Sequence, residues 1–497
     1  MNKQRSLSTN IIPVLLALLS SLALFMNGSV ATQGNILFIL NQETTGITLP
    51  CLIITIFLIV FYKESYQKFL TTKKGATHSI AACFSLFMLL GISYINNGNW
   101  DFLFYSFKQF LIAAITFSGY FILFDIIICL LYAYFSEKNL TILNDISDKV
   151  INYGKQHYPL FVFTVITICW LPFLIVFLPG SVPHDGAVQI NMFFDMNSMT
   201  NNHPWLVSIF MGFFVKLGCH ISDNLGIFLI TLIMYLIEAL CYTVVCTKIY
   251  SWKLPATINF LSVSFFAIVP VFGGYAAAVI KDSLFTSFFS LYMALFIDLI
   301  IKKQKLNDIK HILFLLLIGL FVCFTRNNGI YLVIPTYFSI FFLCLKQNKK
   351  VAPALFIATL VIYFLVESIA APLLGVNAGS KGEMLSIPFQ QTARYLKEYP
   401  GDVSDEEKRI ISKVLDYDNL AENYNPEISD PVKSTFHAGS VEDIREYLKI
   451  WFRMLLRHPN VYFEATLNNT YGYLYPFHNC DSLGAYQLYQ KNRFATY

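Results

Sequence analysis

The chain has 497 residues, of which 56% are hydrophobic, 16% aromatic and only 13% charged, and its mean hydropathy is +0.56. Soluble proteins carry about 25% charged residues, so this composition excludes a water-soluble fold and indicates a polytopic membrane protein. The net charge of +4 is small, and its cations lie in short clusters between apolar runs. That pattern is typical of cytoplasmic loops rather than of a nucleic-acid-binding surface.

The ten cysteines do not form a disulfide framework. Seven lie inside apolar runs and Cys344 lies at the end of one, so only Cys219 and Cys480 are placed to face an outer compartment. No spacing of cysteine and histidine is typical of a zinc site. We therefore interpret the cysteines as small buried hydrophobic residues.

The first part of the chain contains five apolar runs long enough to cross a membrane, at residues 11–26, 47–62, 78–95, 110–135 and 159–178. The basic residues 1–5 precede the first run and predict an uncleaved anchor with its amino terminus inside. The basic loop 63–74 is then cytoplasmic by the positive-inside rule, and so is the mixed-charge loop 136–157. The fifth span therefore leads to the outside at residue 179.

Three later clusters of lysines fix the topology of the second part. Residues 248–253, 301–305 and 346–350 are all predicted to be cytoplasmic. A span over residues 225–247 must then run from outside to inside, so the apolar run 204–219 cannot cross. That run is also short and contains Lys216, and we predict that it lies along the outer interface.

The result is an all-α bundle of about eleven spans with one large outer loop, 179–223, that carries a juxtamembrane helix. After residue 376 charges become frequent, and Ser404-Asp-Glu-Glu407 predicts a capped helix start. We expect three regions: amino-terminal transmembrane helices (1–158), a transmembrane core with the outer loop (159–376), and a small, mainly helical outer region (377–497). The chain stops without a final anchor or polar tail, as a truncated sequence would.

This topology brings a small set of polar residues to the outer face. They are His184, Asp185 and Asp195; Asn201, Asn202 and His203; Lys281 and Asp282; Arg326 and Asn327. Two acids and two cations on one face fit group transfer from an anionic, membrane-bound donor. Lys281 and Arg326 could hold a phosphate leaving group. Asp185 could accept the proton of an attacking hydroxyl.

Each of these residues also has a purely structural interpretation. Asp185 could cap a helix that starts at Ala187, and Asp282 could cap the helix that follows it. Lys281 could simply extend its ammonium to the interface, and His203 could only begin a helix. We interpret Asp195 as a solvated loop acid. The acids inside apolar runs, Asp125, Glu238 and Glu367, are best explained by hydrogen bonds between helices or by positions at helix ends.

The order of these features resembles the GT-C superfamily of membrane glycosyltransferases, which use polyprenyl-phosphate sugars. Examples are the protein O-mannosyltransferases and the aminoarabinose transferases of lipid A. Their first large outer loop has an acidic motif soon after a span, and then a surface helix opening with His-Pro or Pro-Pro-Leu. His184-Asp185 and His203-Pro-Trp-Leu206 are similar to these elements, and Phe-Val-Lys-Leu-Gly follows at residues 214–218.

Within that superfamily the chain looks closest to a poorly characterised bacterial branch with extra amino-terminal spans, a Lys-Asp pair and an Arg-Asn-Gly turn. Lys281-Asp282 and Arg326-Asn-Asn-Gly329 resemble those two motifs, and the likeness covers residues 161–329. Many members have two adjacent acids where this chain has His184-Asp185. The resemblance therefore leaves open whether Asp185 and Asp282 bind a divalent cation, Mg²⁺ or Mn²⁺.

The resemblance implies an enzyme of the bacterial cytoplasmic membrane, an inverting glycosyltransferase with its active site facing outside. Asp185 would be the catalytic base, and His184, His203, Lys281, Asp282, Arg326 and Asn327 would bind substrate. The partners would be a polyprenyl-phosphate sugar, membrane lipids and an extracytoplasmic glycan, lipid or protein acceptor, with no nucleic acid. The alternatives are a transporter or lipid-linked-glycan flippase, which should carry its polar residues on midplane helices, and an inactive scaffolding relative.

Overall fold

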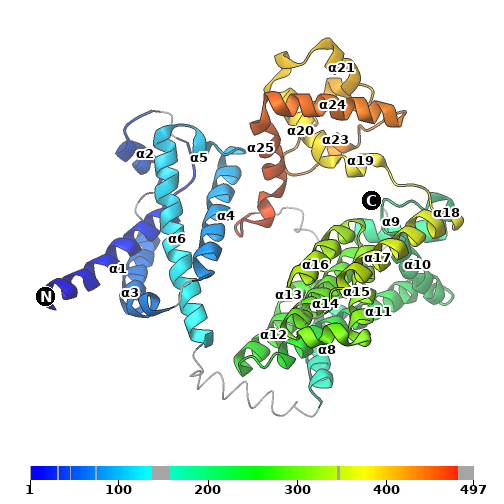
Figure 1. Ribbon diagram of the computed structural model, residues 1–497. Helices are drawn as coiled ribbons and strands as arrows, with labels where there is room; N and C mark the ends of the chain where they lie inside the picture. The colour runs from blue at the N-terminus through cyan, green and yellow to red at the C-terminus, as the bar shows by residue number, and fades with distance from the viewer. Residues whose placement is uncertain are drawn as a thin grey trace. The chain divides into compact units, whose positions relative to one another are not determined.

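The computed structural model describes residues 2–30, 33–44, 46, 48–72, 75–136, 157–343 and 348–478 (Figure 1). Most of the described residues are helical, and their only strand-like pairings are three isolated bridges. Cys344, Cys480, nearly all of the predicted loop 136–157 and part of the lysine cluster 346–350 lie outside the described residues. The chain divides into two units, residues 1–137 with 381–484 (unit 1) and residues 138–380 with 485–497 (unit 2).

Seven helices in the described part of the chain are long and apolar enough to cross a membrane. They are α3 (Leu49–Thr71), α4 (Thr77–Asn97), α6 (Phe107–Ser136), α8 (Tyr158–Val176), α11 (Asp223–Ser251), α14 (Lys281–Ile301) and the run Val351–Leu373. The protein is therefore an all-α polytopic membrane protein, as its composition predicts. The predicted total of about eleven spans stays a prediction.

The remaining predicted spans are shorter or broken helices. Pro270 bends α12 (Ala256–Ile268) and α13 (Pro270–Ala276) by 49°, and the pair could form an eighth span. The helix α15 (Ile309–Thr325) has 17 residues because the side chain of Asp308 caps its start and a turn at Arg326 ends it. At 1.5 Å per residue it is about 26 Å long, somewhat less than the hydrocarbon core of a bilayer.

Unit 1 joins helices from both ends of the chain. Its amino-terminal part contains α1 (Asn2–Phe25), α2 (Ile36–Glu43), α3, α4, α5 (Asp101–Phe104) and α6. Its carboxyl-terminal part contains α19 (Lys381–Met384), α20 (Ser386–Glu398), η6 (Pro400–Asp402), α21 (Asp405–Ile411), α22 (Tyr417–Leu420), α23 (Asp430–Lys433), α24 (Val441–Arg457), α25 (Pro459–Thr470) and η7 (Tyr471–Tyr473). The two parts meet at Gly98, whose carbonyl accepts hydrogen bonds from Arg394 (3.3 Å) and Asn468 (2.5 Å).

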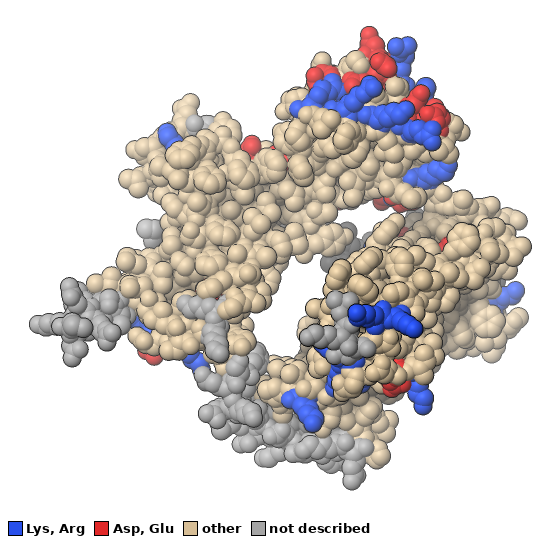
Figure 2. All heavy atoms as spheres, in the orientation of Figure 1, with Lys and Arg blue, Asp and Glu red and all other residues tan. Residues whose placement is uncertain are grey.

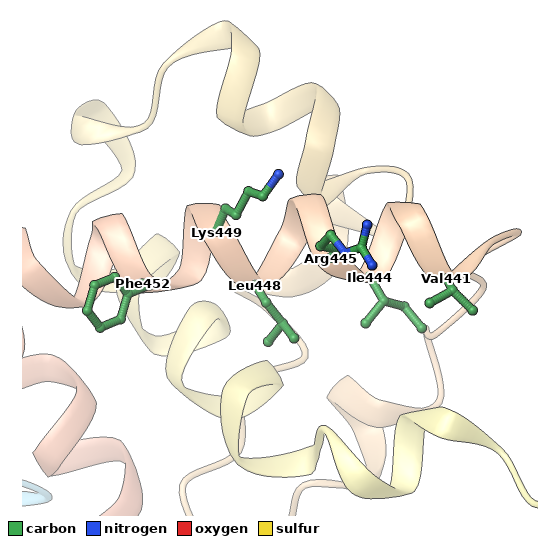
Figure 3. Close-up of a pocket in the computed structure, with 6 residues that line it drawn as sticks. All are labelled: Val441, Ile444, Arg445, Leu448, Lys449 and Phe452. Carbon is green, nitrogen blue, oxygen red and sulfur yellow. The ribbon is translucent and has the colours of Figure 1, made fainter.

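The carboxyl-terminal part of unit 1 consists of short helices and carries many charged residues. Lys, Arg, Asp and Glu gather over it in the face shown in Figure 2. Ser404 and Glu407 form the predicted capping box, which is confirmed. The helix α24 buries Tyr447, Ile450 and Met454 and turns the opposite face outward. A shallow groove on α24 is lined by Val441, Ile444, Arg445, Leu448, Lys449 and Phe452 (Figure 3).

Unit 2 contains the predicted core. Besides α8 and α11–α15 it holds α9 (His184–Phe194), η2 (Met196–Ser198), α10 (Trp205–Cys219), η3 (Lys303–Asn307), η4 (Asn327–Gly329), α16 (Ile330–Leu343), α17 (Val351–Phe364), the π-helix η5 (Leu365–Ala370) and α18 (Ala371–Leu373). Buried Trp170 and Tyr242 anchor the packing of α8 against α11, and Tyr292 anchors that of α14. The run predicted to lie at the interface, 204–219, is the helix α10, which packs on α9 and α11.

Candidate active site

The predicted outer loop 179–223 contains two α-helices, α9 and α10, with the short helix η2 between them, and Asp185 lies at the start of α9. The helix α9 begins at His184 with Pro183 as its N-cap. Asp185 is therefore the second residue of the helix, and the alternative that it caps a helix starting at Ala187 is wrong. A carboxylate in the first turn is stabilised by the positive end of the helix dipole.

A short backbone pairing holds the start of α9 beside the start of α14. The amide of Ser181 donates to the carbonyl of Ala277 (2.9 Å), and the amide of Val279 donates to the carbonyl of Ser181 (2.7 Å). Gly186 makes this close approach feasible, because a Cβ there would lie 1.9 Å from the carbonyl oxygen of Val279. Two helix amino termini, each with an aspartate at its second position, are thus brought together.

The second of these aspartates is Asp282, on α14. The N-cap of α14 is Ile280, so Asp282 does not cap its helix either. Its carboxylate lies 3.9 Å from the Lys281 ammonium and 3.2 Å from the Arg326 guanidinium. Arg326 comes from the turn that ends α15, and its guanidinium also lies 5.3 Å from the centre of the Phe285 ring. Asp282 therefore links two cations from different helices.

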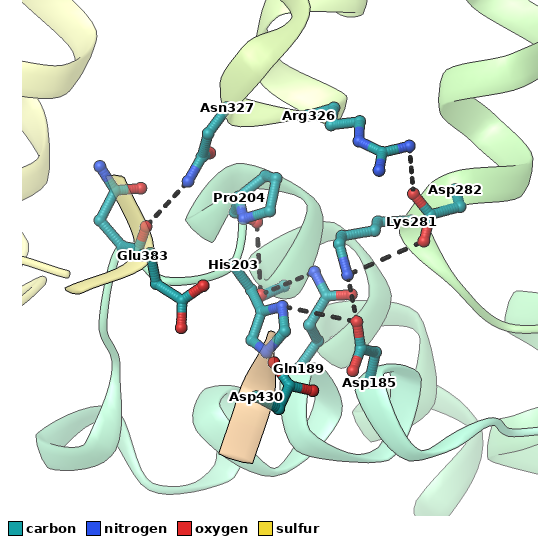
Figure 4. Close-up of polar contacts among 12 residues, drawn as sticks. Asp185, Gln189, His203, Pro204, Lys281, Asp282, Arg326, Asn327, Glu383 and Asp430 are labelled. Carbon is teal, nitrogen blue, oxygen red and sulfur yellow. Dashed lines mark hydrogen bonds and ion pairs between the residues drawn. The ribbon is translucent and has the colours of Figure 1, made fainter. Parts of the chain in front are cut away.

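Lys281 connects the two aspartates. Its ammonium donates to Oδ2 of Asp185 at 2.5 Å, so Asp185, Lys281, Asp282 and Arg326 form one alternating row of charges (Figure 4). The Lys281 side chain is 12% exposed, whereas those of Asp185 and Arg326 are 42% and 50% exposed. The row is thus buried at its centre and open at both ends.

The electrostatics of the row hold Asp185 in its charged form. Partial burial acts to raise the pKa of Asp185, but the hydrogen bond and charge of Lys281, with smaller contributions from His203 and His184, outweigh it. The pKa of Asp185 is therefore lower than that of an ordinary aspartate. Nδ1 of His203 lies 4.0 Å from Oδ2 of Asp185, and His184 is exposed at the first residue of α9.

A second backbone pairing holds the middle of the loop, between α9 and α10. The amide of Asn201 donates to the carbonyl of Asn377, and the amide of Asn377 donates to the carbonyl of Met199, both at 2.9 Å. The side chain of Asn327 donates to the carbonyl of Asn201 (2.9 Å). Asn327 therefore connects this pairing to the turn that carries Arg326.

Two residues outside the predicted site set also contribute. The hydrogen bonding predicted for Glu367, an acid in an apolar run, is confirmed, because Glu367 in the π-helix η5 accepts a hydrogen bond from the side chain of Asn201 (2.8 Å). The other contributor, Gln189, was not identified from the sequence. Gln189 lies one helical turn after Asp185, is buried and donates to Ser208 (3.2 Å). The i, i+4 spacing could have placed Gln189 on the face of Asp185.

Two residues of the predicted outer set lie apart from the charged row. Asp195 is exposed and accepts from the amide of Asn197 (3.2 Å), so its side chain caps the short helix η2. This is consistent with its interpretation as a solvated loop acid. Asn202 accepts a hydrogen bond from the amide of Ser380 (2.6 Å) and thus acts in the fold of the loop.

The predicted divalent-cation ligands, Asp185 and Asp282, are arranged around Lys281. The described residues hold no group of three or more His, Cys, Asp or Glu side chains that could bind a metal ion. Two carboxylates that share an ammonium do not fit the oxygen-rich coordination that Mg²⁺ or Mn²⁺ prefers. Asp185 and Asp282 therefore do not fit the predicted role of metal ligands.

The fold and the site define a polytopic membrane protein with a row of paired acids and cations at the amino ends of two of its helices. The chain belongs to a family of unknown function, DUF6020, whose sequence model matches residues 194–487. That range includes His203, Lys281, Asp282 and Arg326 and begins after Asp185. No curated protein and no solved structure matches the chain.

Proposed function

We propose that this chain is an integral membrane glycosyltransferase with a GT-C-like architecture. It transfers a sugar from a polyprenyl-phosphate-linked donor to an extracytoplasmic glycan, lipid or protein at the outer face of the bacterial cytoplasmic membrane. The observation that supports this most is the row of Asp185, Lys281, Asp282 and Arg326. It offers a base and two phosphate-binding cations within one contact network.

In the proposed step, Asp185 takes the proton of the acceptor hydroxyl as the hydroxyl oxygen attacks the anomeric carbon. The bond from that carbon to the phosphate oxygen breaks, and polyprenyl phosphate leaves with the electron pair. Lys281 and Arg326 bind the leaving phosphate, Arg326 through its planar fork of donors. Attack opposite the leaving group inverts the anomeric configuration.

The ion pair between Lys281 and Asp185 couples donor binding to the strength of the base. With Lys281 bound to it, Asp185 has a lowered pKa and is a weak base. A donor phosphate competes for the same ammonium, and as Lys281 turns toward the phosphate the pKa of Asp185 rises. The base is therefore strengthened when the donor is in place.

The other predicted substrate-binding residues surround this row. His203 lies near Asp185 and could orient the acceptor, and His184 is exposed beside it. Asn327 holds the turn of Arg326 against the outer loop. Because Lys281 and Arg326 supply the positive charge, we expect turnover to persist in EDTA and to be insensitive to added Mg²⁺ or Mn²⁺.

The direct test uses the purified full chain in lipid nanodiscs with a panel of polyprenyl-phosphate sugars and a cell-envelope extract as acceptor. Released polyprenyl phosphate is common to all acceptors and is measured by mass spectrometry. At least one donor should release it, and the transferred sugar should have the opposite anomeric configuration by NMR. Movement of donors between leaflets without release would contradict the proposal and favour a flippase.

A further inference from the structure

Three lysines converge on one buried aspartate at the end of α14 that lies away from Lys281. The ammonium of Lys305 lies 2.6 Å from the Asp298 carboxylate, that of Lys302 3.2 Å and that of Lys248 3.3 Å. Trp252 donates its indole N–H to the same carboxylate (3.0 Å). The lysines come from α11, the end of α14 and η3, so the cluster joins three elements.

The charges in this cluster do not balance. The Asp298 side chain is 1% exposed, and the side chains of the three lysines are 17–24% exposed and thus mostly buried. One carboxylate offsets one of three positive charges, and two remain in excess. Ammoniums held this close together repel one another, and the repulsion is stronger where water is partly excluded.

The described residues near this cluster in the sequence add to the excess of positive charge. Residues 248–253, 298–311 and 348–350 contain eight lysines and two aspartates. The second aspartate, Asp308, already caps α15 and pairs with His311 at 2.7 Å. In these stretches, therefore, no further carboxylate is present to balance the lysines around Asp298.

From this arrangement we propose that Lys248, Lys302 and Lys305 form a binding site for a phosphate-bearing anion. A phosphate group supplies the missing negative charge and several strong acceptor oxygens for the ammonium donors. Basic pockets between transmembrane helices bind anionic lipid headgroups, so a membrane phospholipid is one source of the phosphate and free phosphate is the other. The site is separate from the row at Asp185, because the 21 residues of α14 place its two ends about 30 Å apart.

The test measures the thermal stability of the full chain in detergent as short-chain phosphatidylglycerol, short-chain phosphatidylcholine or inorganic phosphate is added. We expect phosphatidylglycerol to raise the unfolding temperature saturably and phosphatidylcholine to have little effect. Stabilisation by inorganic phosphate as well would identify the phosphate group alone as the ligand, and its absence would identify the lipid. If neither anion stabilises the protein, the proposal is wrong.

Substitutions of single lysines test whether the anion binds at the cluster around Asp298. Lys302→Gln leaves Lys248 and Lys305 to pair with Asp298, so the buried carboxylate keeps its partners. Loss of one charged hydrogen bond should weaken anion binding about tenfold. Lys302→Arg should retain it, and Lys349→Gln, an exposed lysine of the same region, should change it little. Equal binding by Lys302→Gln and the native chain, or an equal loss in Lys349→Gln, would overturn the assignment.

Discussion

The ammonium of Lys281 pairs with the carboxylates of two aspartates. The Lys281 side chain is mostly buried, which keeps its ammonium between them. The side chain is 12% exposed, and its nitrogen has Asp185 at 2.5 Å and Asp282 at 3.9 Å. A lysine that only extended to the interface would leave its ammonium in water. The structure instead turns it inward, between two helix amino termini that also favour nearby negative charge.

Replacing Lys281 by glutamine should lower stability at neutral pH but not in acid. The folded-state pKa of Asp185 is lowered, so its ion pair stabilises the fold above the usual aspartate pKa of about 4 and is lost as the pH falls through the folded value. Asp185 is half-exposed, so we expect about 1 kcal/mol at pH 7. Thermal unfolding of the native chain and of Lys281→Gln should differ at pH 7, and the difference should shrink as the pH falls below about 4 and through the lowered folded pKa of Asp185. A difference that stays constant through that acidic range would contradict the ion pair.

Gly186→Ala tests the close approach of α9 to α14. The added methyl would meet the carbonyl oxygen of Val279, which is fixed by its own backbone pairing, and we expect a loss of about 1–3 kcal/mol. Gly274→Ala is the matched control, because nothing lies within 4 Å of its Cβ position. Chemical or thermal unfolding of both variants measures the effect. Equal stabilities would mean that the start of α9 is not held against residue 279.

At the residue scale the sequence predicted which side chains share one face but not how they touch. Positive-inside topology placed Asp185, Lys281 and Arg326 together because charge and span length are properties of local sequence. The alternative interpretation of both aspartates as helix caps is wrong, because each lies two residues after the true N-cap. Pro183 and Ile280 take those positions, since backbone geometry at a helix start depends on the tertiary pairing at Ser181.

At the element scale, the predicted outer loop 179–223 is fixed near its start and at its middle by backbone pairings to distant segments. Ser181 pairs with residues 277–279, and Asn201 pairs with Asn377. Neither pairing has a local sequence signal, because the bridges Ser181–Ala278 and Thr200–Asn377 join segments 97 and 177 residues apart and depend on how the surrounding helices pack. The helix α10 was predictable, since its length and Lys216 are local features.

Asn327→Ala should loosen the middle of the predicted outer loop, around Asn201. The side chain of Asn327 donates a hydrogen bond to the carbonyl of Asn201. Its removal should lower the free energy of local opening at this pairing by about 1 kcal/mol. Hydrogen exchange at the amides of Asn201 and Asn377 should accelerate about fivefold. Asn328→Ala, at an exposed neighbouring position, should leave those rates unchanged. Unchanged exchange in both variants would contradict a role for Asn327 in holding the loop.

At the scale of the whole molecule, the chain is organised as two units whose residues are not contiguous. The sequence predicted regions 1–158, 159–376 and 377–497 from changes in composition, and unit 1 draws on the first and the last of them. This grouping has no compositional signal, because it depends on contacts such as that of Arg394 with the carbonyl of Gly98, 296 residues away. The general class, an all-α polytopic membrane protein, follows from hydropathy alone.

Arg394→Met should destabilise unit 1 strongly. Arg394 is 5% exposed, pairs with Glu398 at 2.7 Å and contacts the buried Glu464 directly. Removing the guanidinium leaves a buried carboxylate without its cation, which costs about 3–5 kcal/mol. Thermal unfolding should show this loss, and the double substitution Arg394→Met with Glu464→Gln should recover part of it. Arg409→Met, at an exposed site, should be nearly neutral. A loss of stability no larger than that of Arg409→Met would contradict a stabilising role for the buried Arg394–Glu464 ion pair in unit 1.

The proposed glycosyl transfer depends most directly on Asp185, and its neighbour in the same loop, Asp195, supplies a matched control. In nanodiscs, donor binding and release of polyprenyl phosphate are measured separately for the native chain, Asp185→Asn and Asp195→Asn. Asp185→Asn should bind the donor at least as well as the native chain, because Lys281 is freed for the phosphate, and should release polyprenyl phosphate at least 100-fold more slowly. Asp195→Asn should behave like the native chain. Release by Asp185→Asn at the native rate would contradict the assignment of this loop as the active site.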